Sequence, residues 1–567
     1  MKQGKRGSHH FATRVPGRIG SSLQGVVHEG TDTELGALGS AGGAGRVELE
    51  CDVVVLGSGG AALTAAISAH DFGAKEVVVL EKSGMVGGTT AMSGGMLWVP
   101  NNHHQLEAGV PDSDEDIVAY LDSLAPGMLD PETLAAFLES GPEMVRHLAD
   151  RTPVRLFAYT GFPDYQPYAP GAKTEGGRSL DNEAFSFEQL GSLAARVNPT
   201  KMAYQVRGSL MEAVNRTLDA ETLAYREQHD YRGLGQALIG ALYKAILDRR
   251  IPIQFETRAR HLIKDGGRVI GVVAERSDGE IRVRARQGVV LATGGFEWNK
   301  ELVDTFLRGP LTGPVSVPEC DGDGLLMAIE AGAKLGNMQN AWWMQSVLEK
   351  KVEHRDAKPN YLLGSDERAR PGAILVNRAG KRFVNEAANY NAIGQALHAF
   401  DAGTHTYTHL PYWLIIDQRY RDRYRIFNAR SGQPDPSYVM KGNSLEELAG
   451  IAGIDPKGLK ETVERFNGMV RNGHDDDFNR GDTTYDNWCF WGDQSVKPPH
   501  CTLGVLDQAP FYAVKMEAGA LGTGGGPKTN GNAQVLDWDN KPIQGLYAAG
   551  NAMAAVLVNV YGGAGGT

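Results

Sequence analysis

Short apolar runs followed by a glycine or an acidic residue are the main hydrophobic pattern of this 567-residue chain. Each run is too short for a helix and is apolar at successive positions, without the alternation of a half-exposed strand. Buried parallel strands have this pattern because both faces of their sheet are covered. We therefore predict a parallel sheet built from segments far apart in the chain. The runs lie at 51–56, 77–80, 288–292 and 543–549.

Other segments follow a helical or an alternating pattern. Apolar residues recur at helical spacing over 114–150 and 233–250, which predicts helices there. Between 253 and 286, short β-rich runs are separated by Asp265-Gly-Gly267 and Ser277-Asp-Gly279, which are typical of hairpin turns. These runs predict a small antiparallel meander, after which the run at 288–292 rejoins the parallel sheet. The four expected strands are 253–255, 262–263, 269–275 and 281–286.

Composition divides the chain into a discontinuous nucleotide domain and an insertion. A chain of this length favours two domains. From about 335 to 514 aromatic residues become more frequent and glycine loops rarer, as in Tyr412–Asp417. We predict a Rossmann-like α/β domain in two parts, with an inserted α+β substrate domain. The expected ranges are 1–46 for a flexible extension, 47–335 and 515–567 for the nucleotide domain, and 336–514 for the insertion.

Charge and cysteine usage narrow the class of protein. The net charge of −11 argues against a nucleic-acid-binding surface. The four cysteines have no paired metal or redox spacing, which is typical of reduced thiols in a cytoplasm-like compartment. No apolar stretch of about 18 residues occurs, so we expect no integral membrane association. We expect no metal site either: His103-His104 has no third ligand at a sensible spacing.

The first glycine motif predicts a dinucleotide site. The run at 51–56 leads into Gly57-Ser58-Gly59-Gly60-Ala61-Ala62, a tight turn followed by a small-residue helix. Gly57 permits the turn, Gly59 lets backbone N–H groups approach a pyrophosphate, and Ala62 lets helix and strand pack closely. Glu81 ends the next strand, 24 residues after Gly57, where its carboxylate can accept ribose hydroxyls.

These segments together resemble the flavoprotein group that contains fumarate reductases and 3-ketosteroid dehydrogenases. The shared marks are the motif at 57–62, Glu81, the loop at 87–95, Ala292-Thr-Gly-Gly295 and Leu546–Asn551, within residues 51–567. The resemblance implies FAD as cofactor, an inserted domain that caps the flavin ring, and an external electron acceptor. The FAD-binding residues that it implies are Gly57, Ser58, Gly59, Gly60, Ala61, Ala62, Glu81, Lys82, Ser83, Gly88, Thr89, Thr90, Ser93, Gly94, Gly95, Arg258, Ala292, Thr293, Gly294, Gly550 and Asn551.

Within this group the chain is most similar to the 3-ketosteroid Δ1-dehydrogenases. A fumarate-type site needs cationic or strongly donating groups for a dicarboxylate, yet no histidine follows His500. The stretch at 521–525 instead matches the Leu-Gly-Thr motif of the steroid enzymes. By their local context Tyr165, Tyr390 and Tyr561 match the catalytic tyrosines of that family.

Phenol groups can assist a reaction that removes a hydride and a proton from neighbouring carbons beside a ketone. Flavin accepts the hydride, while preorganised donors stabilise charge on the ketone oxygen. We expect the Tyr561 hydroxyl and the Gly565 N–H to hold that oxygen, Tyr390 to act as base, and Tyr165 to donate a hydrogen bond that favours the Tyr390 phenolate. The expected substrate is an apolar, steroid-like ketone, which suggests occasional contact with a membrane surface.

Two alternatives stay open at this point. One is a fumarate-reductase-like flavoprotein that acts on another enone or unsaturated acid. The other is an inactive truncated flavoprotein, because the sequence ends at Thr567 where the resemblance implies a further helix against the flavin. Without that helix we expect weak FAD retention. Gly562, where the family often has proline, predicts a looser loop after Tyr561.

Overall fold

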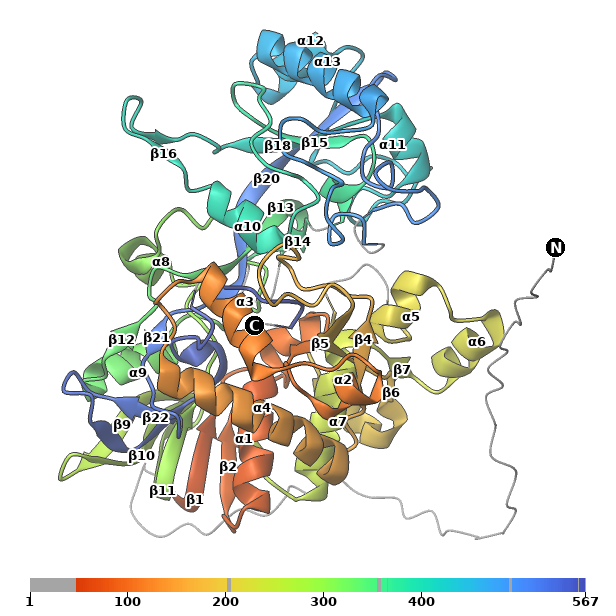
Figure 1. Ribbon diagram of the computed structural model, residues 1–567. Coiled ribbons are helices and arrows are strands. Elements are labelled where there is room, and N and C mark those ends of the chain that lie inside the picture. Colours follow the sequence, from red (N-terminus) through yellow and green to blue (C-terminus); the bar gives the residue numbers. More distant parts are fainter. Residues whose placement is uncertain are drawn as a thin grey trace. The chain divides into compact units, whose positions relative to one another are not determined.

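Two large β-sheets organise the part of the chain that the structure describes (Figure 1). The computed structural model describes residues 47–200, 205–353, 358–364, 366–488, 492–558 and 560–565. The extension predicted at 1–46 therefore lies outside the described residues. No described helix has both the length and the apolar character needed to cross a membrane.

The first sheet is the predicted nucleotide-binding sheet. Its strand order is β22-β23-β11-β1-β2-β8, and all neighbours except β22 and β23 run parallel. All four residues of β2 are buried, as expected for an apolar run covered on both faces. The strands are β1 (Val47–Leu56), β2 (Val77–Leu80), β8 (Ile253–Gln254), β11 (Gly279–Leu291), β22 (Gln534–Leu536) and β23 (Pro542–Ala548).

The meander is only partly as predicted. Strands β9 (Arg258–Asp265) and β10 (Arg268–Arg276) form the antiparallel hairpin, but the run at 253–254 is β8, which pairs parallel with β2. The two strands expected at 281–286 and 288–292 are one strand, β11. Its first part, Gly279–Arg284, pairs with β10, and its pairing with β1 runs from Ile281 to Leu291. The pairing of β1 with β11 continues on both sides of a register shift between Cys51 and Val53.

Helices cover the first sheet with a nearly continuous apolar surface. Helix α7 (Leu234–Asp248) packs on α1 (Gly60–Asp71) and buries residues on all of its faces, so its four-residue leucine spacing shows only part of its apolar surface. The helical segment predicted at 114–150 is two helices, α3 (Asp114–Leu124) and α4 (Pro131–Arg151). Asp130 starts α4 by accepting backbone N–H bonds, which separates the two.

The second sheet forms the core of the predicted insertion. Its order is β14-β13-β20-β18-β15, and β19 also pairs with β20. Helices α12 (Leu445–Ala452) and α13 (Pro456–Asn472) lie at the far end of this part in Figure 1. Strand β20 runs through position 514, and the domain boundaries stay predictions. The strands are β13 (Ala341–Glu353), β14 (Pro359–Leu363), β15 (Ala373–Asn377), β18 (Tyr412–Asp417), β19 (Val439–Gly442) and β20 (Phe511–Thr523).

Smaller elements and the loops between them position the remaining candidate residues. A three-stranded sheet in the order β3-β5-β4 leads into the loop that contains Tyr165, and Tyr390 begins α10. The elements are β3 (Leu97–Trp98), β4 (Leu156–Thr160), β5 (Gly176–Asn182), β6 (Phe185–Ser186), β7 (Tyr231–Arg232), β12 (Leu335–Gly336), β16 (Phe400–Asp401), β17 (Thr406–Tyr407), β21 (Gly526–Pro527), α2 (His103–Glu107), α5 (Leu210–Asn215), α6 (Ala220–Gln228), α8 (Lys300–Phe306), α9 (Asp323–Ala331), α10 (Tyr390–Ala396) and α11 (Gln418–Arg423).

Candidate active site

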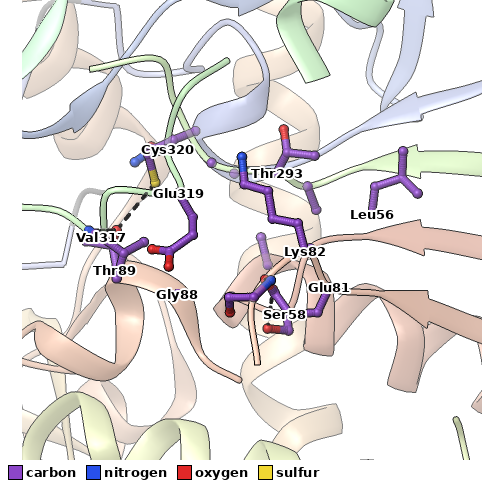
Figure 2. A pocket seen from close by; sticks show the side chains of 18 of the residues that line it. Leu56, Ser58, Glu81, Lys82, Gly88, Thr89, Thr293, Val317, Glu319 and Cys320 are labelled. Atoms are coloured by element: carbon purple, nitrogen blue, oxygen red, sulfur yellow. Dashed lines mark hydrogen bonds between the residues drawn. The ribbon is translucent and has the colours of Figure 1, made fainter. Parts of the chain in front are cut away.

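A pocket at the carboxyl ends of β1, β2 and β11 contains most of the predicted cofactor residues (Figure 2). The carboxyl edge of a parallel sheet is where open α/β folds bind their ligands. Segments that are far apart in the chain, 56–61, 80–90, 292–294 and 549–551, meet here because β1, β2, β11 and β23 are neighbours in the sheet. The predicted residues that line the pocket are Gly57, Ser58, Gly59, Gly60, Ala61, Glu81, Lys82, Ser83, Gly88, Thr89, Thr90, Ala292, Thr293, Gly294, Gly550 and Asn551.

The glycine turn has the close backbone approach that the motif predicts. Gly57 has a φ of +102°, and a Cβ on it would lie 2.4 Å from the Ala292 carbonyl oxygen. A Cβ on Gly60 would lie 3.2 Å from the Thr90 side chain, whose Oγ1 accepts the Gly60 N–H at 3.1 Å. Ala62 lies behind the pocket and is fully buried in the helix–sheet core. This turn leaves room and N–H donors for a phosphate.

Glu81 is held as a hydrogen-bond acceptor at one end of the pocket. The Ser58 hydroxyl donates to its Oε2 at 2.6 Å (Figure 2). The Ser83 N–H donates to its Oε1 at 2.8 Å. Burial raises the pKa of Glu81 above its usual value. Carboxylate oxygens have further lone pairs, so both can still accept ribose hydroxyls. The glycine cradle and this acid fit the adenosine diphosphate part of FAD.

Five predicted cofactor residues do not line the pocket. Ala62 is one of the five. Ser93 and Gly95 stabilise the loop at 87–95 instead, since the Ser93 hydroxyl donates to the Thr90 carbonyl and accepts the Gly95 N–H. Gly94 is exposed. Arg258 forms an ion pair with Asp323, which does line the pocket.

Several residues in and beside the pocket belong to no sequence motif. Among them are Asp321 and Asp323, whose carboxylates form ion pairs with both Lys82 and Arg258 and so neutralise the positive charge beside the pocket. On the other side Thr89 Oγ1 accepts the Val317 N–H at 3.3 Å and contacts Cys320. The lining residues that sequence reasoning missed are Leu56, Leu80, Asn198, Thr257, Ala259, Val317, Glu319, Cys320, Asp323 and Ala549.

The structure brings the three predicted tyrosines together. The rings of Tyr165 and Tyr561 stack with centroids 5.2 Å apart, and Tyr390 meets both rings edge-on at 5.4 and 5.3 Å. The Tyr165 hydroxyl donates to the Tyr390 hydroxyl at 2.9 Å. All three side chains are at most 7% exposed. Trp342 links this group to the cofactor pocket: its ring meets Tyr561 at 5.3 Å and its indole N–H donates to Asn551 at 2.9 Å.

Aromatic and apolar side chains surround the three phenols. Phe162 stacks on Tyr165, Trp488 packs on Phe162, and Tyr485 meets Tyr165 edge-on at 5.1 Å. The surroundings therefore suit an apolar ring compound rather than a dicarboxylate. Gly565, the fourth predicted residue, has a φ of +97°, and a Cβ on it would lie 2.5 Å from the backbone of β3.

Burial controls the protonation of the phenols. It raises the pKa of Tyr390 and of Tyr165 well above the ordinary value. Tyr165 and Tyr561 raise the pKa of Tyr390 further. Tyr485 and Tyr561 raise the pKa of Tyr165, whereas its hydrogen bond with Tyr390 lowers it. The hydrogen bond expected to favour the Tyr390 phenolate therefore does not lower the pKa of Tyr390 in the resting protein, and the role of Tyr390 as base stays a prediction. Burial is the largest cause for Tyr390, and its hydrogen bond with Tyr165 acts in the same direction.

One buried cation, Arg368, lowers the pKa of a phenol in this group. The Arg368 guanidinium, 1% exposed, lowers the pKa of Tyr165, although less than burial raises it. Its Nη1 donates to the carbonyls of Glu386 and Ala388, just before Tyr390. Its Nε and Nη2 have no hydrogen-bond partner among the described residues. This positive charge is therefore free to stabilise negative charge that develops near the phenols.

Buried ion pairs hold the chain segment before Tyr390 in place. Glu386 binds Arg382 at 2.7 Å and Arg480 at 3.0 Å, and Arg382 also binds Asp475 at 2.8 Å. Asp475 is thus fully buried, although it begins the acidic run Asp475–Asp477. The network anchors the segment that leads to Tyr390.

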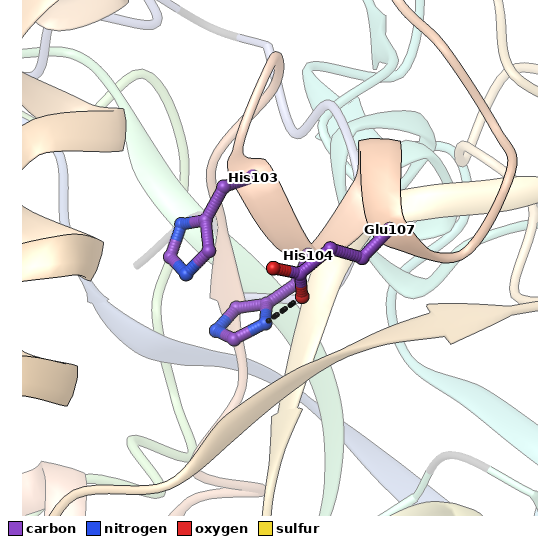
Figure 3. Close-up of side chains that lie close together, drawn as sticks. All are labelled: His103, His104 and Glu107. Carbon is purple, nitrogen blue, oxygen red and sulfur yellow. Dashed lines mark hydrogen bonds and ion pairs between the residues drawn. The ribbon is translucent and has the colours of Figure 1, made fainter.

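A third ligand does lie beside His103 and His104. The ligand atoms of these two residues and of Glu107 lie within 4.8 Å of one another, and His104 Nδ1 is 3.2 Å from Glu107 Oε2 (Figure 3). The statement that no third ligand accompanies the pair is therefore wrong, because one helical turn brings Glu107 back to them. Arg146 is close enough to His103 to lower its pKa, and that charge also opposes a bound cation. The absence of a metal stays a prediction.

Comparisons with known proteins agree with this geometry. Residues 52–567 match the family described as FAD binding domain. The chain belongs to this family. FAD is its cofactor, and the α/β fold with a capping domain is confirmed. The 3-ketosteroid delta1-dehydrogenase from Sterolibacterium denitrificans, solved with 1,4-androstadiene-3,17-dione, is 34% identical over 91% of this chain and 96% of its own, with a TM-score of 0.84.

Two curated relatives with named activities are also similar to this chain. A 4-oxocyclohexanecarboxylate 2-dehydrogenase from Sinomonas cyclohexanicum is 41% identical over 91% of this chain and 90% of its own length. A 3-oxosteroid 1-dehydrogenase from Mycobacterium tuberculosis is 37% identical over 91% of this chain and 95% of its own. The chain is therefore an FAD-dependent oxidoreductase, and its resemblance to the 3-ketosteroid Δ1-dehydrogenases is confirmed.

Proposed function

We propose that this protein is an FAD-dependent 3-ketosteroid Δ1-dehydrogenase, which introduces a double bond between C1 and C2 and passes the electrons to an external acceptor. The observation that carries the proposal is the group of three buried phenols, which touch one another and connect to the cofactor pocket through Trp342 and Asn551. Apolar walls and phenols suit a steroid ketone.

Each residue has a defined part in this reaction. Bound FAD supplies the hydride acceptor. Tyr561 and the Gly565 N–H hold the ketone oxygen, which makes the hydrogens on the adjacent carbon acidic. Tyr390 acts as the phenolate, takes the proton from that carbon and becomes neutral, and Tyr165 donates a hydrogen bond to the Tyr390 oxygen. The proton thus ends on Tyr390, while the electron pair of the other broken C–H bond leaves as hydride.

The Arg368 charge answers the difficulty that burial creates for a phenol base. A phenolate in this apolar group lacks water to stabilise it. Arg368 is close enough to lower the pKa of Tyr165, and two of its guanidinium nitrogens have no hydrogen-bond partner among the described residues, so negative charge shared over the Tyr390–Tyr165 pair gains a counter-charge.

A smaller cyclic keto acid is the second candidate substrate. It is favoured by the 41% identical relative, whose name gives 4-oxocyclohexanecarboxylate. The numbers in both relatives' names place the dehydrogenated carbon two positions from the oxo carbon. Both substrates therefore use the same proton and hydride chemistry and differ in size and in the carboxylate.

Anaerobic reduction of the bound flavin tests the proposal. We expect a 3-keto-4-ene steroid to bleach the flavin absorbance, and succinate to leave it unchanged. Bleaching by 4-oxocyclohexanecarboxylate alone would favour the second candidate. Tyr390→Phe should lower kcat by about 10²- to 10³-fold without loss of flavin, since it removes the base. Tyr168→Phe, which changes a 75% exposed tyrosine, is the control. Full activity in Tyr390→Phe would exclude the assigned base.

A further inference from the structure

The two loops that carry Tyr165 and Tyr561 are joined directly. The Tyr165 N–H donates to the Gly562 carbonyl at 3.0 Å, and the two rings stack with an interplanar angle of 10°. These loops are almost 400 residues apart in the chain and come from different elements. Their alignment therefore depends on side chains that touch both loops.

Trp98 on β3 is one residue that touches both. Its indole N–H donates to Asp164 Oδ1 at 3.1 Å, next to Tyr165, and its backbone N–H donates to the Gly565 carbonyl at 3.3 Å. The loop after Tyr561 lies flat on the indole: a Cβ on Gly562 or Gly563 would lie 2.8 or 2.5 Å from it. Gly562 is thus packed tightly, contrary to the looser loop expected from its sequence.

Tyr120 on α3 makes the second bridge. Its hydroxyl donates to the Gly562 carbonyl at 2.7 Å and accepts the Gln166 N–H at 3.3 Å. The side chain is fully buried. Tyr120 and Trp98 therefore each bind the residues on one side of Tyr165 and the glycines after Tyr561.

A buried ion pair between Arg178 and Asp164 fixes the carboxylate that the Trp98 indole binds. Asp164 accepts Arg178 Nη1 at 2.7 Å and the Lys173 N–H at 2.9 Å, in addition to the Trp98 indole. Arg178 is fully buried and also binds Asp112 with two bonds of 2.7 and 2.9 Å. Asp164 thus has donors on both carboxylate oxygens, so it cannot turn away from the indole without leaving a buried charge unpaired.

We propose that Trp98 and Tyr120 are positioning residues that hold the Tyr165 phenol and the Tyr561–Gly565 oxyanion site in one fixed geometry. This inference rests on the proposed function for the roles of Tyr165, Tyr561 and Gly565. Both residues act through hydrogen bonds to other residues, and neither is assigned contact with substrate. Their loss should therefore reduce turnover more than substrate binding, because misplaced catalytic groups cost transition-state stabilisation.

The test uses the holoenzyme and three variants. Trp98→Phe removes the indole N–H and keeps an aromatic ring and the backbone N–H. Tyr120→Phe removes only the hydroxyl, and it carries the test if Trp98→Phe does not fold. Tyr412→Phe is the matched control, since Tyr412 is also fully buried and its hydroxyl donates to a backbone carbonyl, that of Glu517, at 3.2 Å.

Two measurements decide the outcome. Amide hydrogen exchange, which needs no turnover, should become faster in both 164–166 and 560–565 in each bridge variant and in neither segment of the control. The kcat should fall about tenfold with KM within about twofold and with flavin content and Tm equal to those of the control. Faster exchange in one segment only, or a kcat like that of the control, overturns the inference.

Failure of the proposed function gives a different result. If the wild-type protein turns over no cyclic ketone, the function is wrong, whereas the exchange measurement still shows whether the two residues hold the loops together. A kcat loss that merely follows loss of flavin or of Tm also overturns the positioning role, because it would reflect general destabilisation.

Discussion

Glu297 is a buried acid beside the glycines that follow β11, and no motif indicated its environment. The side chain is 3% exposed, and its Oε2 has no hydrogen-bond partner among the described residues. Burial raises the pKa of Glu297 to about 7, although the Ser316 hydroxyl and other donors lower it. The residue therefore changes charge near neutral pH while the protein is folded.

The raised pKa predicts how stability depends on pH. Between about 4.5 and 7 the folded protein holds the Glu297 proton more tightly than the unfolded chain, so this residue lowers the free energy of unfolding as pH rises through that window. The rise from 4.5 to about 7 corresponds to about 3 kcal/mol. The free energy of unfolding of Glu297→Gln minus that of wild type should therefore be more positive at pH 8 than at pH 5. Urea unfolding at saturating FAD measures this difference. An equal difference at both pH values would contradict the pKa.

At the scale of elements, apolar runs and glycine turns correctly predicted the strands, the turn and the helix that depend on local sequence. The strands at 51–56 and 77–80, the turn at 57–62 and the helix at 233–250 are all present. The continuous course of β11 could not be predicted, because its alternating and fully apolar halves resemble two strands. The partner of β8 was also hidden: two residues carry no information on whether their neighbour is parallel.

The turn between β1 and α1 is predicted to be the element most sensitive to an added methyl group. In Gly57→Ala the Cβ would meet the Ala292 carbonyl at 2.4 Å, and the backbone at φ +102° would be strained. Gly73→Ala is a control with the same strain at φ +114° but no atom within 4 Å. We expect Gly57→Ala to weaken FAD binding at least about tenfold relative to Gly73→Ala, measured by fluorescence titration of the apoprotein. Equal affinities would show that the close approach is not required.

At the scale of the whole molecule, the candidate site is a product of topology. Motif-bearing segments reach the pocket because β1, β2, β11 and β23 share one parallel edge, and this much was predictable. Val317, Glu319 and Cys320 reach it from a loop without sequence signal. The bridges of Trp98 and Tyr120 were equally hidden, because each joins segments that are close only after folding.

This assembly predicts that FAD stabilises the folded protein as a unit. The pocket contains residues from 56 to 551, so a ligand that fills it binds the folded state and has no comparable site in the unfolded chain. At a free FAD concentration of 100 times Kd the free energy of unfolding should rise by about 2.7 kcal/mol. Differential scanning calorimetry with increasing FAD should give one transition that moves to higher temperature. FMN, which lacks the adenosine that Glu81 and the glycine turn fit, should shift it less. Two transitions, of which FAD moves only one, would show that the insertion unfolds independently of the cofactor site.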